Sequence, residues 1–95
     1  MPDKLGEGLR GILARWGLGA VWDLHEVMEA FPKVFKPYPG ARFLDFSRGV
    51  LRVGVRSAAL RHELAMRKPE LIKAMNALLG RELVKDILFT RGAQE

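Results

Sequence analysis

Residues 42–56 read RFLDFSRGVLRVGVR, and this stretch decides the fold. Its second half alternates between two sets of side chains with a period of two, as in a strand that is buried on one face. One set is Leu51, Val53 and Val55, and the other is Val50, Arg52, Gly54 and Arg56. The run from Arg42 to Phe46 precedes this strand, with Ser47-Arg48-Gly49 between them. We therefore predict a β-hairpin with two arginines on its exposed face.

The chain after the hairpin predicts two helices and a third strand. Ser57 is a suitable N-cap for a helix that begins at Ala58. Lys68-Pro69 interrupts this helix, because proline disfavours the helical conformation in the residue before it but suits the first turn of a new helix. The new helix ends at Gly80, and the apolar run from Leu83 to Thr90 predicts a last strand. We expect this strand to be joined by a right-handed connection if it pairs in parallel.

Two helices are predicted before the hairpin. The first has an apolar stripe at helical spacing, formed by Leu5, Leu9, Ile12, Leu13 and Trp16. The second runs from Ala20 to Phe31, where Pro32 is expected to end it. The fold class is therefore α+β, in the order α-α-β-β-α-α-β, with a three-stranded sheet and helices packed on one face. Residues 1–95 are expected to form a single domain, with N-terminal helices in 4–31 and the sheet and remaining helices in 41–90.

Composition excludes several classes of protein. The 95 residues are 48% hydrophobic and 28% charged, as in an ordinary globular domain, and they include no cysteine. No apolar run approaches the roughly 18 residues of a membrane span, and the first residues contain no apolar h-region of the kind found in secretory signals. A secreted disulfide-rich protein, a membrane protein and a large enzyme are excluded, and a cytoplasmic protein is expected.

The basic charge is concentrated in the middle of the chain. The formal net charge is +5, but residues 32–68 hold nine lysines and arginines against Asp45 and Glu63, a local charge of +7. Such a cluster can bind phosphates, or it can simply keep the outer faces of strands and helices soluble. Charge alone gives the two interpretations about equal weight.

No motif predicts catalysis, a metal or a cofactor. His25-Glu26 and His62-Glu63 begin a zinc-binding His-Glu-x-x-His pattern, but Glu29 and Met66 stand where the second histidine belongs. No phosphate-binding loop of the Walker type occurs, and the two serines are better explained as turn and capping residues. We expect no enzyme activity and no small-molecule substrate.

The aromatic residues favour packing over base stacking. Phe43 and Phe46 have opposite strand parity, so they share one sheet face only if a bulge shifts the register. Trp16, Trp22 and Phe31 lie on or beside the apolar stripes of the predicted helices, where core packing is the more common role.

The order strand–strand–helix–helix–strand after a helix resembles a type II KH domain. In nucleic-acid-binding KH domains a Gly-x-x-Gly loop between the two central helices clamps the phosphate backbone. Residues 65–69 occupy that position here and contain no glycine, while the literal match at 8–11 lies in the first predicted helix. The standard phosphate clamp is therefore missing, although Arg67 and Lys68 supply charge at its position.

Further motifs follow in a particular order between residues 20 and 91. They are Trp22, the approach Lys36-Pro37-Tyr38-Pro39, the strand from Gly49 to Val55, the helix start from Ser57 to Leu64, and Leu78-Leu79-Gly80 followed by Val84, Ile87 and Phe89. Together they resemble the DciA-like bacterial replicative helicase loaders, whose main domain is KH-like without the glycine loop. The chain departs from the family at Leu60, where a second tryptophan is usual, and at 23–29, where a glycine is usual. The resemblance implies a non-enzymatic adaptor for DNA replication that binds the replicative DNA helicase and single-stranded DNA, with no membrane role.

The candidate nucleic-acid-binding residues are Arg52, Arg56, Arg61, Arg67 and Lys68. If they form one surface with five phosphate contacts, log affinity for single strands should fall against log salt with a slope of roughly −3.5. Two other functions remain open. One is a KH-like RNA-binding protein, possibly ribosome-associated, that uses the same face. The other is a protein-interaction module that does not bind nucleic acid.

Overall fold

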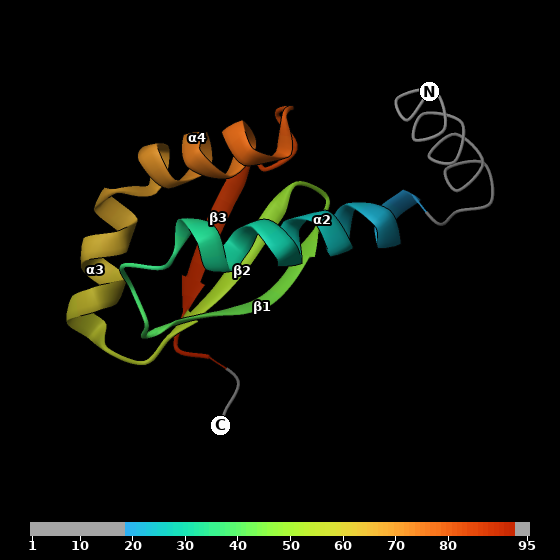
Figure 1. Ribbon diagram of the computed structural model, residues 1–95. Coiled ribbons are helices and arrows are strands. Elements are labelled where there is room, and N and C mark those ends of the chain that lie inside the picture. The colour runs from blue at the N-terminus through green and yellow to red at the C-terminus, as the bar shows by residue number, and fades with distance from the viewer. Residues whose placement is uncertain (1–18, 93–95) are drawn as a thin grey trace.

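Six helices and strands follow one another in the computed structural model, which describes residues 19–92. They are the helix α2 (Gly19–Val34), the strands β1 (Ala41–Ser47) and β2 (Val50–Val55), the helices α3 (Ala58–Met66) and α4 (Lys68–Leu79), and the strand β3 (Asp86–Thr90) (Figure 1). The predicted α+β class is confirmed, and the element order from the second predicted helix onward is that of a type II KH domain. The helix predicted over residues 4–16 lies outside the described residues.

The three strands form one mixed sheet in the order β1-β2-β3. β1 and β2 are antiparallel, and β2 pairs in parallel with β3, so that Leu51 lies opposite Ile87. The hairpin turn has positive φ angles at both Arg48 (53°) and Gly49 (82°). Positive φ at both turn residues is the requirement of a type I′ turn, whose twist matches that of the two strands.

A β-bulge in β1 brings both of its phenylalanines to the same face. Phe43 pairs with Val53 and Phe46 pairs with Leu51, and the register shifts between Phe43 and Asp45. Val53 and Leu51 are two residues apart on β2, so their partners share the face on which both are buried. The sequence predicted that Phe43 and Phe46 share a face only if a bulge shifts the register, and the register shift is present.

All three described helices contribute to one core on one face of the sheet. α2 packs on β1 and on α4, while α3 and α4 contact β3 (Figure 1). The fully buried side chains come from every layer and include Val27, Leu51, Val53, Leu64, Met75 and Ile87. No helix within residues 19–92 covers the opposite face, where Arg52 is exposed and its neighbour across the strands, Leu88, is 47% exposed. The predicted packing of helices on one face is confirmed.

Two element boundaries differ from those predicted. α2 continues through Pro32 to Val34, because Phe31 and Phe35 stack in the core with their rings 4.4 Å apart. The Phe35 N–H donates to the Phe31 carbonyl, so the helical turn closes without the missing N–H of proline. β3 begins at Asp86 and not at Leu83, because residues 81–85 form a loop in which a side chain of α4 binds the backbone.

Candidate nucleic-acid interface

A groove of about 440 Å³ runs between α3 and the edge strand β3. Its walls are Ala58, Arg61, His62, Ala65, Lys68, Ile87, Leu88 and Phe89. The four residues from α3 stand at helical spacing, so they form one face of that helix. The two alanines leave space between the helix and the strand, and the basic side chains lie around it. The groove therefore combines an apolar floor with positive charge.

Arg61 is fixed by the backbone at the end of β2. Ser57 caps α3, its Oγ accepting a hydrogen bond of 3.1 Å from the Leu60 N–H, as predicted. One turn into the helix, Nη1 of Arg61 donates to the carbonyls of Val55 (2.8 Å) and Arg56 (3.2 Å). This guanidinium therefore has a set position at the groove wall, and part of its donor capacity is used within the protein.

A single residue joins α3 to α4 at the position of the KH glycine loop. Arg67 is both the last cap of α3 and the first cap of α4, with φ −98° and ψ 10°. Its guanidinium forms ion pairs with Glu63 (3.6 Å) and Glu70 (3.9 Å), and all three side chains are at least half exposed. Exposed ion pairs of this kind contribute little stability and exchange readily with other anions. Arg67 thus supplies positive charge where the loop would supply backbone N–H groups.

Lys68 is held by a carboxylate from β3. Its Nζ lies 3.1 Å from Oδ1 of Asp86, and the same oxygen accepts a hydrogen bond of 2.8 Å from the Ile87 N–H. The hydrogen bond from Lys68 is the main cause that keeps the pKa of the Asp86 carboxyl below its usual value, and the bond from Ile87 adds to it. The carboxyl of Asp86 is therefore ionised at neutral pH.

The two remaining predicted residues lie outside the groove walls. Arg52 is on the open face of the sheet, between Asp45 of β1 and Leu88 of β3 in the strand register. Leu88 lines the groove, whereas Arg52 lines a separate hollow together with Leu44, Asp45, Thr90 and Gly92. Arg56 follows the end of β2 and is exposed, and its carbonyl accepts from Arg61. Of the five predicted residues, two line the groove, and that all five act as one surface stays a prediction.

Sequence reasoning missed two polar members of this region. His62 lines the groove beside Arg61, and the spacing of residues 58, 61, 62 and 65 on a helix is the signal that could have identified it. Asp86 had no such signal, because it meets Lys68 only through the pairing of two elements that are 18 positions apart in sequence.

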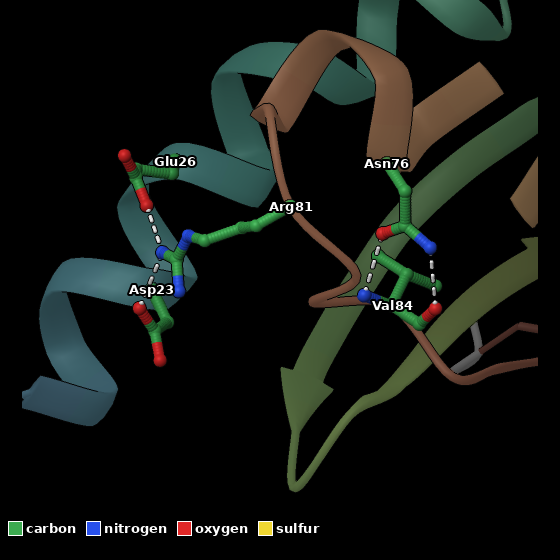
Figure 2. A network of polar contacts seen from close by, with 5 residues as sticks. All are labelled: Asp23, Glu26, Asn76, Arg81 and Val84. Atoms are coloured by element: carbon green, nitrogen blue, oxygen red, sulfur yellow. Dashed lines mark hydrogen bonds and ion pairs between the residues drawn. The ribbon is translucent and has the colours of Figure 1, made fainter. Parts of the chain in front are cut away.

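A separate polar network holds the loop after α4 (Figure 2). Nη2 of Arg81 binds Oδ1 of Asp23 at 2.9 Å and also binds Oε1 of Glu26, both on α2. The hydrogen bond with Asp23 is the largest cause that raises the pKa of Arg81. Glu26 is part of this contact, with 29% of its side chain exposed.

The loop is also held from the α4 side. Nδ2 of Asn76 donates to the Val84 carbonyl (2.9 Å), and the Val84 N–H donates to Oδ1 of Asn76 (2.8 Å), as Figure 2 shows. The two networks set the position at which β3 begins, and β3 forms one wall of the groove. Within residues 19–92, no cluster of three or more carboxylate or histidine side chains is suited to a metal ion.

Comparison with models of protein families matches residues 4–89 to the family described as Dna[CI] antecedent, DciA. No curated protein matches the chain at a significant level. In the part of the chain that the structure describes, no helix has the length and apolar character needed to cross a membrane.

Proposed function

The chain belongs to the DciA family, which is associated with helicase loading in DNA replication, and from this premise we propose that it is a non-enzymatic adaptor that binds the replicative DNA helicase and single-stranded DNA. The family match carries this proposal, because it spans nearly the whole chain. It agrees with the resemblance that the ordered motifs of the sequence indicate.

The groove between α3 and β3 supports the DNA-binding part of the proposal. Arg61 and Lys68 line it, Arg67 directly precedes Lys68 in the chain, and Arg52 pairs across the strands with Leu88, which also lines it. These groups are suited to contact phosphates, which do not carry sequence information. With a one-residue junction in place of the glycine loop, we expect weak binding of single strands with little dependence on base sequence.

The helicase-binding part is tested by a pull-down from bacterial lysate with the full chain as bait, with and without nuclease. Recovery of the replicative helicase after nuclease treatment is the expected result, because the proposed contact is between proteins. Loss of the helicase on nuclease treatment would contradict a direct contact. Failure to recover it in either arm would remove the helicase from the proposal.

The DNA-binding part predicts a strong dependence on salt. If the five cations contact phosphates, log affinity of the pure protein for a single-stranded oligonucleotide should fall against log salt with a slope of roughly −3.5. Charge reversal of Arg52 and Arg56 to Glu should weaken binding by about tenfold or more, because two attractions become repulsions. Fluorescence anisotropy over a range of salt concentrations measures both quantities.

The matched control is the double reversal of Lys33 and Lys73 to Glu. These lysines lie on α2 and α4 and are not among the five predicted binding residues, and the change in net charge is the same. We expect this control to weaken binding much less than the Arg52 and Arg56 reversal. Equal losses, or a flat salt response of the unmodified protein, would remove the proposed surface. Competition with single-stranded RNA of the same sequence distinguishes the RNA-binding alternative.

A further inference from the structure

We propose that Asp86 is a built-in competitor for the phosphate-binding Lys68, so that nucleic acid must displace a carboxylate of the protein before it gains this contact. The inference rests on the proposed binding of single-stranded DNA in the groove between α3 and β3. It adds a residue of opposite charge that limits the affinity of that same groove.

Both partners are held in place by the backbone. Lys68 is the first residue of α4 and lines the groove. Asp86 is the first residue of β3, paired with Val50, and its N–H donates to the Gly49 carbonyl at 3.2 Å. The carboxylate is further oriented by the Ile87 N–H. The ammonium therefore meets a prepositioned anion in the free protein.

The ion pair between Lys68 and Asp86 is accessible to solvent, so another anion can replace the carboxylate. Lys68 and Asp86 are 35% and 50% exposed, so water and ligands reach both groups. A carboxylate and a phosphate offer an ammonium the same kind of charge-assisted hydrogen bond. An incoming phosphate can take the place of the carboxylate. The net binding free energy is then smaller, because the ion pair between Lys68 and Asp86 must be broken and because the charge of Asp86 repels the phosphate.

The direct test is Asp86→Asn, which removes the negative charge. The amide oxygen of Asn can still accept the hydrogen bond from the Ile87 N–H, so the start of β3 is preserved. We expect single-stranded DNA to bind about two- to fivefold more tightly, the factor that corresponds to an exposed ion pair.

Two further variants separate this effect from a change in total charge. Glu29→Gln makes the same change of net charge on α2, where Glu29 pairs with His25, and it should leave the affinity nearly unchanged. In a Lys68→Ala background, Asp86→Asn should no longer increase affinity, because the cation that it releases is gone. A gain that persists without Lys68, or an equal gain from Glu29→Gln, would overturn the proposal.

The pair is also testable without DNA. In a carboxyl-detected NMR titration, the pKa of Asp86 should lie below the ordinary aspartate value and should rise toward it in Lys68→Ala, since Lys68 is the main cause of the lowered pKa. An unchanged pKa in Lys68→Ala would contradict the pair. If the unmodified protein binds DNA and Asp86→Asn brings no gain, the inference fails while the proposed function stands. If neither protein binds DNA, the DNA-binding part of the proposed function fails, and this inference fails with it.

Discussion

Leu51→Ala is expected to lower the free energy of unfolding by about 3 kcal/mol, within the usual range for a buried leucine in a core. Leu51 is fully buried in the central strand, with Phe46 opposite it on β1 and Ile87 on β3. Truncation leaves a cavity where the two other strands and the helices meet, and the paired strands on both sides restrict its collapse. For a small domain this is a large share of the roughly 5–15 kcal/mol of typical total stability. Urea denaturation followed by circular dichroism gives the value.

Leu88→Ala is the matched control for this prediction. It removes the same atoms one position beyond Ile87 on the neighbouring strand, but Leu88 is on the open face and 47% exposed. We expect a loss well under 1 kcal/mol, because little apolar surface leaves a packed environment. If both variants lost a similar amount of unfolding free energy, Leu88 would have to be packed as tightly as Leu51, which would contradict a core on one face of the sheet.

Asn76→Leu is expected to cost about 2–6 kcal/mol of stability, although the two side chains are similar in size. Asn76 binds both the N–H and the carbonyl of Val84, and Val84 is 1% exposed. The substitution leaves two backbone groups without partners in a place that water scarcely reaches, and each such group costs about 1–3 kcal/mol. Thermal or chemical denaturation measures the loss, and faster hydrogen exchange of the Val84 amide locates it.

Asn76→Asp serves as the graded control. Its carboxylate still accepts from the Val84 N–H but offers no donor to the Val84 carbonyl at neutral pH. We expect the stability of this variant to lie between that of the unmodified protein and that of Asn76→Leu. Hydrogen exchange of the Val84 amide should be faster than in the unmodified protein but slower than in Asn76→Leu. A leucine variant as stable as the unmodified protein would mean that the loop after α4 finds other partners.

The parts of the fold that depend on short-range patterns were predictable from sequence. The alternation from Val50 to Val55 identified the central strand and its buried face, and Ser57 and Gly80 marked helix ends that the structure confirms. These signals lie within a few residues of the feature that they specify. The lack of glycine in residues 65–69 likewise predicted that no Gly-x-x-Gly loop joins the two helices, and a one-residue junction stands there.

The parts that depend on tertiary contacts were not predictable. Proline was expected to end α2 at Phe31, but the helix continues to Val34, with Phe31 stacked on Phe35. β3 begins later in the chain than predicted, because the side chain of Asn76 on α4 binds the backbone of Val84. The candidate site has the same division. Sequence named Arg61 and Lys68, which line the groove, whereas the carboxylate of Asp86 beside Lys68 follows only from the way α4 and β3 come together.

The parallel pairing of β2 with β3 also sets an order of events in time. Phe46 and Leu51 are five positions apart, whereas Leu51 and Ile87 are 36 positions apart. Closing the longer segment costs more chain entropy, so we expect the hairpin and the two helices to form early and β3 to join last. The arrival of β3 completes the core and, in the same step, supplies one wall of the groove. A chain in which β3 has not yet paired has the basic residues but lacks the groove. We therefore expect DNA binding to recover during refolding at the rate of the slowest folding phase.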